Sequence, residues 1–293
     1  METKLKSHLS THISNIILLS LLASALLALT SCNKVDFAPQ PSPGVTTSGG
    51  APICYPFGGG VKGQGLVGNI TYLTGSQLQN PFTNVASYIN SAGGQVPNQV
   101  LLSGLNIPIE YFSNGFADSN GSTIKSATGS PLVEYFGIHA ISYFVPGVGG
   151  PQPMSGNYQV AVLSDDGSIV TIKGAAQSGG DLVINNDGTH SAQLGCTSDY
   201  MTINSSSKFQ FTVDYYQGPA NTIALTLLYR PLPSGNTLDQ ECNVPHQDTY
   251  FADDTGYPNP PVQQQTYTNL LARGWTVVDG SHYSIQGLTS ICQ

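Results

Sequence analysis

Residues 209–216 alternate between apolar and mostly polar side chains with a period of two. The apolar set is Phe209, Phe211, Val213 and Tyr215, and the intervening set is Gln210, Thr212, Asp214 and Tyr216. This period places one set on each face of a β-strand, whereas the same spacing would scatter the apolar residues around a helix. The segment therefore predicts a strand with one buried face.

Three more runs have the composition of strands, at residues 158–163, 168–173 and 223–229. The last is long and apolar enough to lie centrally in a sheet. Asp165-Asp166-Gly167 separates the first two runs, and an Asp-Gly step between strands predicts a hairpin with both aspartates at its tip.

Residues 64–232 contain no sustained helical periodicity, and Gly- and Pro-bearing turns separate their apolar runs. This pattern predicts an all-β fold, an antiparallel β-sandwich, which we place at residues 51–232. After Pro231 the pattern changes, with one short helix expected at 264–273 and one strand at 275–278. We therefore predict that residues 233–293 form a short mixed extension joined to the sandwich by disulfide bonds.

The first 31 residues predict a cleaved export signal. Lys4 and Lys6 give a basic start, and residues 16–29 form an apolar run without a charge. This run is shorter than the roughly 20 residues that span a bilayer, and small residues follow it.

Leu29-Thr30-Ser31-Cys32 resembles the bacterial lipobox. The resemblance implies a lipoprotein that is cleaved before Cys32 and anchored to a membrane by lipid on the Cys32 sulfur. An ordinary signal peptide that ends near a cysteine, or an uncleaved anchor, is the alternative. By resemblance to the sorting of enterobacterial lipoproteins, Asn33 rather than Asp after the cysteine implies the outer membrane or cell surface more than the inner membrane. Residues 32–50, rich in Pro, Ser and Gly, then predict a flexible tether.

Four cysteines remain once Cys32 is lipidated: Cys54, Cys196, Cys242 and Cys292. An even number in an exported chain predicts two disulfide bonds. Three connectivities are possible, and the sequence does not choose among them. A metal site built from these thiols is disfavoured, because no two cysteines have a CxxC-like spacing.

The charge of the exported chain excludes some partners. Removing residues 1–31 leaves 16 acidic and 7 basic residues, a formal charge of −9. Such a chain is not expected to bind nucleic acid or an anionic membrane surface. Only 9% of all residues are charged, while uncharged polar residues abound. The abundant Tyr and Asn suit contact with carbohydrate, although any turn-rich sandwich has a similar composition.

Several motifs follow one another in a recognisable order. They are GLVGNITY (65–72), YFGI (135–138), GNY (156–158), SDDGS (164–168), IKG (172–174), VINNDGTH (183–190) and YYQGP (215–219). Together they resemble the anthrax protective-antigen type β-sandwich domain, a lectin-like module found in bacterial toxins, glycosidases and yeast flocculins. The resemblance covers about residues 64–232.

The resemblance implies a Ca²⁺ site at Asp165 and Asp166, with a cis peptide bond between them and vicinal sugar hydroxyls completing the coordination of the ion. Flocculin-like members add an asparagine near the last strands. Gln217 falls close to that place here, with Asn221 four residues on, so these two are the further candidate ligands. Two adjacent carboxylates suit Ca²⁺, which takes 6–8 oxygen ligands.

The same residues also allow a purely structural interpretation. Asp165 and Asp166 favour turns through their own backbone hydrogen bonds, and so does Asp187 in its Asn-Asp-Gly step. His190 is then a packed or surface histidine.

Catalysis is not expected. The chain has no GxSxG, HExxH, Walker or GxGxxG motif in the required context, and its histidines are scattered. Glu110 and Glu134 are a glycosidase pair only in principle. The sequence thus predicts an envelope lipoprotein that binds carbohydrate with Ca²⁺, or serves in adhesion. The alternative is a structural or protein-binding envelope component without a sugar ligand.

Overall fold

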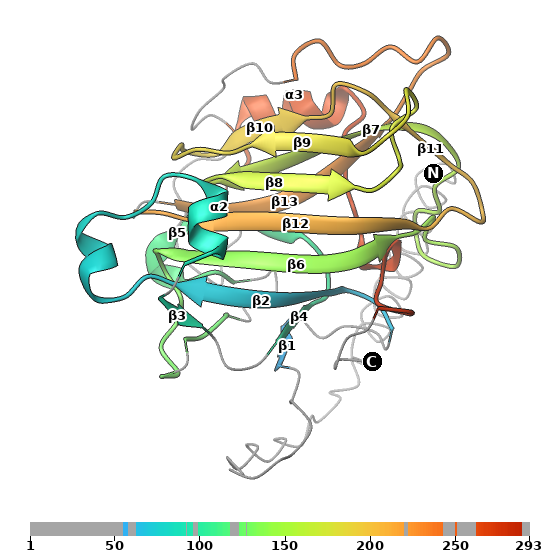
Figure 1. Ribbon diagram of the computed structural model, residues 1–293. Helices are drawn as coiled ribbons and strands as arrows, with labels where there is room; N and C mark the ends of the chain where they lie inside the picture. The colour runs from blue at the N-terminus through green and yellow to red at the C-terminus, as the bar shows by residue number, and fades with distance from the viewer. Residues whose placement is uncertain are drawn as a thin grey trace, which may run out of the picture. The chain divides into compact units, whose positions relative to one another are not determined.

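The computed structural model describes residues 55–57, 63–91, 93–95, 99–117, 123–126, 128–219, 222–242, 250 and 262–288 (Figure 1). All of them belong to one structural unit, residues 51–293. The predictions for the signal peptide, Cys32, the tether, Cys54, Asn221 and Cys292 fall outside the described residues and stay predictions.

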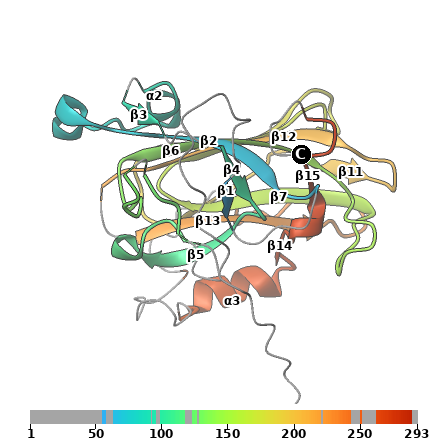
Figure 2. The ribbon, with the colours of Figure 1, turned by 90° about the horizontal axis from the view of Figure 1, so that it is seen from below.

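Two sheets face each other in this unit (Figure 2). The order in the larger one is β1 (Tyr55–Phe57), β4 (Val100–Leu102), β2 (Leu66–Tyr72), β6 (Phe136–Phe144), β12 (Phe209–Gln217), β8 (Ser168–Ile172) and β9 (Leu182–Asn186), with β3 (Gly94–Gln95) on β2 and β15 (Tyr283–Ser284) on β6. The order in the smaller one is β10 (Gln193–Cys196), β7 (Gly156–Asp165), β13 (Thr222–Pro231) and β14 (Thr276–Val277), with β11 (Met201–Ile203) on β7 and β5 (Asn106–Tyr111) on β13. Apart from the parallel pair β1–β4, neighbouring strands among the described residues are antiparallel.

One short α-helix packs on the outer face of each sheet. The described helices are α2 (Val85–Ile89), α3 (Gln265–Ala272) and the 3₁₀ turns η2 (Gly75–Gln79), η3 (Phe112–Asn114) and η4 (Gly280–His282). Helix α2 lies against the large sheet, and α3 lies against the small sheet (Figure 2). The all-β sandwich predicted from the sequence is therefore confirmed.

Strand β12 has the two faces that its alternation predicts. Phe211, Val213 and Tyr215 are buried in the core between the sheets. On the opposite face Gln210 is exposed, whereas Tyr216 is buried under α2. The large area of aromatic and aliphatic surface removed from water between the sheets is the main stabilising contribution to such a fold.

Strand β13 is central, as its apolar run predicts. It pairs with β7 along one side and with β5 and β14 along the other. Every residue from Ile223 to Tyr229 is buried. A strand covered on both faces reads as a continuous apolar run, which is the pattern that the sequence shows.

The predicted hairpin at residues 164–167 is wrong. Strand β7 pairs with β13, β10 and β11 in the small sheet, whereas β8 pairs with β12 and β9 in the large one. The chain therefore crosses between the layers at Asp165–Gly167. Both edges of each strand are already paired, so β7 and β8 have no free edge with which to bond each other. A hydrogen bond of 2.8 Å between the hydroxyls of Ser164 and Ser168 spans the crossing.

The C-terminal extension packs on the sandwich. Tyr267 and Leu270 of α3 and the neighbouring Trp275 are buried against the outer face of the small sheet. The helix ends before Gly274, whose φ of 92° suits glycine. Strand β14 extends the small sheet beside β13, and β15 pairs with β6 in the large sheet. The helix and the strand predicted for this segment are both present.

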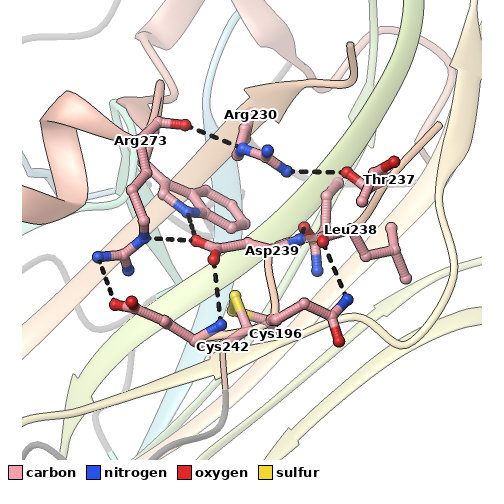
Figure 3. Close-up of polar contacts among 11 residues, drawn as sticks. Cys196, Arg230, Thr237, Leu238, Asp239, Cys242 and Arg273 are labelled. Atoms are coloured by element: carbon pink, nitrogen blue, oxygen red, sulfur yellow. Dashed lines mark hydrogen bonds and ion pairs between the residues drawn. A yellow bond between two sulfur atoms is a disulfide. The ribbon is translucent and has the colours of Figure 1, made fainter. Parts of the chain in front are cut away.

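A disulfide bond and a polar cluster hold this extension (Figure 3). The disulfide joins Cys196 of β10 to Cys242, which selects one pair among the three connectivities left open by the sequence. Next to it, Asp239 Oδ2 accepts hydrogen bonds from Arg273 Nε at 2.8 Å and from Trp275 Nε1 at 2.7 Å. The pKa of the Asp239 carboxyl is lowered, because these hydrogen bonds outweigh the raising effect of burial.

Candidate functional site

The predicted ligand residues lie at one end of the sandwich, where chain segments from both sheets meet. Asp165 ends β7, and Asp166 begins the crossing to β8. The loop 187–190 follows β9, and Gly218 follows β12. The peptide bond between Asp165 and Asp166 is cis, as the family resemblance implies.

Both aspartates are buried and held by hydrogen bonds. Asp165 Oδ2 accepts from the Thr222 hydroxyl at 2.5 Å. Asp166 accepts backbone N–H groups on both oxygens, from His190 at 3.0 Å and from Gly218 at 2.7 Å. The exposed fractions are 5% for Asp165 and 3% for Asp166. The sequence placed them at the tip of a hairpin, but the crossing puts them between loops that cover them.

Burial sets the electrostatics of this end. It raises the pKa of the Asp166 carboxyl, and the hydrogen bonds from Gly218 and His190 lower that pKa again in part. Among the described residues, none forms an ion pair with Asp166. A buried carboxylate in this situation is stabilised by any cation that can reach it.

The Tyr215 hydroxyl is a buried donor beneath the aspartates. It lies 2.5 Å from the Asp165 carbonyl oxygen and 2.7 Å from Gln217 Oε1. Burial, and next the charges of Asp165 and Asp166, raises the pKa of this hydroxyl well above its usual range. Tyr215 therefore keeps its proton and supports the crossing from inside the core.

Gln217, a candidate ligand from the sequence, is fully buried. Its amide nitrogen donates to the Thr222 carbonyl oxygen at 3.0 Å, and its amide oxygen faces Tyr215. Both ends of the amide are thus used inside the protein. Asn221, the other candidate, is outside the described residues.

His190 and Asp187 brace the loop after β9. Both ring nitrogens of His190 lie 3.0 Å from carbonyl oxygens of this segment, those of Asn186 and Ser191. Asp187 Oδ1 accepts from the N–H groups of Gly188 and Val85 at 2.9 and 2.8 Å. These contacts fit the structural interpretation of the two residues.

Close backbone approach explains the glycine of the crossing. A Cβ atom on Gly167 would lie 2.5 Å from Tyr216 Cε1 and 2.8 Å from the Gly188 nitrogen. Glycine at 167 therefore lets the crossing and the loop 187–190 pack together. The sequence marked both glycines as turn formers but carried no sign of this contact.

The two glutamates weighed as a catalytic pair affect different tyrosines. Glu110 is buried and accepts from the Ala117 N–H at 3.4 Å. Burial and, to a smaller extent, the charge of Glu110 raise the pKa of Tyr215, while burial and, to a smaller extent, the charge of Glu134 raise that of Tyr88. In the described part of the chain, no three His, Cys, Asp or Glu side chains gather so as to hold a metal ion. No helix in that same part is both long and apolar enough to cross a membrane.

No family model and no curated protein matches the chain. Among solved structures it is similar to the PA14 domain of the MpAFP antifreeze protein, with 18% identity, 59% of this chain and 84% of that chain covered, and a TM-score of 0.39. It is also similar to the PA14 sugar-binding domain of an RTX adhesin, with 20% identity, 57% of this chain and 89% of that chain covered, and a TM-score of 0.35. A third similar structure is the A domain of epithelial adhesin 9 from Candida glabrata, in complex with Galβ1-4GlcNAc. The identity is 13%, 57% of this chain and 82% of that chain are covered, and the TM-score is 0.35. PA14 domains, the protective-antigen type that the sequence motifs resemble, are thus among the proteins to which this chain is similar.

Proposed function

We propose that Asp165 and Asp166 bind one Ca²⁺ ion and that the bound ion takes two adjacent hydroxyls of a sugar. The domain then acts in carbohydrate binding or adhesion. The observation that carries this proposal is the burial of two consecutive carboxylates at the loop end of the sandwich, with Asp166 in no ion pair among the described residues. A cation there would offset the desolvation of the carboxylates.

The donor set fits a hard cation in part. Carboxylate oxygens are the preferred ligands of Ca²⁺. Each oxygen of Asp166 accepts one backbone N–H and has a second lone pair that a cation can use. The other ligands would be backbone carbonyls, water or sugar hydroxyls. We leave Gln217 out of the proposed set, because both ends of its amide are bonded inside the protein.

We further propose that lipid on Cys32 anchors the domain to the cell envelope. The motif Leu29-Thr30-Ser31-Cys32, after a basic start and a short apolar run, supports this. The tether of residues 32–50 would then keep the domain near the membrane.

Thermal melts with excess Ca²⁺ and with chelator test the cation site. At 100 times its dissociation constant, Ca²⁺ should raise the free energy of unfolding by ~2.7 kcal/mol if only the folded protein binds it. Asp165→Asn should abolish the shift, since it removes a ligand charge while the Thr222 hydroxyl can still bond the amide. Asp199→Asn, a charge removed from another turn, is the matched control and should keep the shift.

Calorimetry with Galβ1-3GlcNAc and Galβ1-4GlcNAc, the ligands of solved adhesin domains, tests the sugar. Binding should require Ca²⁺ and be lost in Asp165→Asn. If the melting temperature of the wild type is the same with Ca²⁺ and with chelator, the aspartates have only a structural role. That result would favour the structural or protein-binding function. If Ca²⁺ raises the melting temperature but the protein binds no sugar of a glycan array, the ion only stabilises the loop.

Metabolic labelling with a palmitate analogue tests the anchor. Wild-type protein should take up the label, and Cys32→Ala should not, because the proposed attachment site is that thiol. Cys54→Ala serves as a control for loss of a cysteine as such. Equal labelling of wild type and Cys32→Ala, or no labelling of either, would contradict the lipoprotein proposal.

A further inference from the structure

Helix α2 is tied to the loop that follows β9. Asp187 Oδ1 accepts the N–H of Val85, the first residue of the helix, at 2.8 Å, although 102 positions separate the two residues. A second side chain caps the same helix end: Asn84 Oδ1 accepts the Ser87 N–H at 2.9 Å. Asn84 precedes the helix directly, whereas Asp187 comes from a distant loop.

The loop that carries Asp187 also holds the Asp166 carboxylate. The His190 N–H donates to Asp166 Oδ1 at 3.0 Å. Gly188 packs so closely on Gly167 that a Cβ atom there would lie 2.8 Å from the Gly188 nitrogen. A displacement of residues 187–190 would therefore move a donor of Asp166 directly.

Helix α2 contacts the same region a second time. The Tyr88 ring stacks on the Tyr216 ring with centroids 4.5 Å apart and planes 12° apart. The Tyr216 hydroxyl lies 2.9 Å from Thr189 Oγ1, and its ring packs against Gly167. The helix is thus joined to the loop through both Asp187 and the stacked tyrosines.

We propose that Asp187 is a positioning residue for the cation site: by binding helix α2 it fixes the loop 187–190 and, through the His190 N–H, the Asp166 carboxylate. The proposal rests on the proposed function at Asp165 and Asp166. A carboxylate held in its binding orientation loses less freedom when the ion arrives, so the ion binds more tightly. Helix α2 then sets the affinity of the site through the loop 187–190.

Calorimetric titration with Ca²⁺ tests the proposal on the folded protein. Asp187→Ala removes the hydrogen bonds to Val85 and Gly188 and should weaken Ca²⁺ binding about tenfold, the lower end of the loss expected when a group that supports a metal ligand is removed. Asp187→Asn keeps the acceptor and should restore affinity to within about twofold of wild type. Asn84→Ala is the matched control, because it removes a cap from the same helix end without releasing the loop.

Amide hydrogen exchange at His190, measured in chelator, gives a readout that needs no ion. Asp187→Ala should speed this exchange about tenfold or more, while Asn84→Ala should leave it near the wild-type rate. If Asn84→Ala acts as strongly as Asp187→Ala, only helix stability matters and the proposal fails. The proposal also fails if Asp187→Asn binds Ca²⁺ as weakly as Asp187→Ala, because the negative charge of Asp187, and not its hydrogen bonds, would then account for the affinity.

Wild-type protein that binds no Ca²⁺ would overturn the proposed function. The exchange rates, which are measured without Ca²⁺, would still test whether Asp187 positions the His190 N–H. Unchanged exchange in Asp187→Ala would refute the positioning role even where Ca²⁺ binds.

Discussion

Replacing Asp166 by alanine should lower the free energy of unfolding by about 2–4 kcal/mol in calcium-free buffer, because it strands two buried backbone donors. These donors are the N–H groups of His190 and Gly218, at 3.0 and 2.7 Å from the carboxylate. The loss is smaller than two full penalties, since the variant also no longer buries a carboxylate. Urea denaturation followed by circular dichroism measures the change.

Asp199→Ala is the matched control. The Asp199 carboxylate also accepts two backbone N–H groups, from Ser178 at 2.9 Å and from Tyr200 at 2.7 Å, but in an accessible turn. Water can replace it there, so the variant should lose less than about 1 kcal/mol. An Asp166→Ala variant as stable as Asp199→Ala would show that the crossing does not depend on this carboxylate.

The stability difference between wild type and Asp166→Ala should depend on pH with a definite sign. Because burial raises the pKa of Asp166, the calcium-free folded state binds a proton more tightly than the unfolded chain does. The stability contributed by this group is therefore greatest below its unfolded pKa, about 4, and falls as pH rises through the folded pKa. Asp166→Ala should lack this part of the acid-range profile, which melts between pH 3 and 7 would show.

Local patterns in the sequence predict the strands well, because each pattern is caused by the environment of one strand. The alternation in residues 209–216 follows from one face in the core, and the apolar run at 223–229 follows from burial on both faces. Both are readable without knowing the neighbouring strands. The helix at 264–273 and its stop at Gly274 are equally local.

The hairpin prediction failed because pairing is not local. An Asp-Gly step fits a tight turn within one sheet and also a crossing between two sheets. The decision is made by β13 and β12, which pair with β7 and β8 and lie more than 30 residues further along the chain. One sign was present in the sequence: residues 158–163 have no polar alternation, as expected of a strand covered on both faces.

Of the candidate site, the sequence indicates only the two carboxylates. Asp165 and Asp166 stand in a recognisable motif, but the groups that hold them do not. Two of the donors are backbone N–H groups, which leave no mark in a sequence, and the Thr222 hydroxyl is 57 positions from Asp165. The family pattern also suggested Gln217 near the ion, and only the packing around Tyr215 shows that its amide is bonded inward.

Removing the disulfide bond in the double variant Cys196→Ala, Cys242→Ala should lower the free energy of unfolding by about 4 kcal/mol, the chain-entropy value for a loop of this size. The two cysteines are 46 positions apart, so the bond restricts a long segment of the unfolded chain. Chemical denaturation of the double variant beside wild type measures the loss. The lost stability should come mainly from the unfolded state, because other contacts hold the extension in the folded one.

Those contacts centre on Asp239, which binds Arg273 and Trp275 through its carboxylate and Gln159 of β7 through its N–H at 2.9 Å (Figure 3). Trp275 is the single tryptophan of the chain and is 2% exposed, so its fluorescence reports whether the extension stays docked. At 25 °C the double variant should keep the wild-type emission maximum, while its melting temperature falls. Asp239→Ala, in contrast, should shift the emission maximum to the red, because the indole N–H of Trp275 loses its hydrogen-bond acceptor. A red shift in the double variant under native conditions would mean that the disulfide, and not the Asp239 cluster, holds the extension on the sandwich.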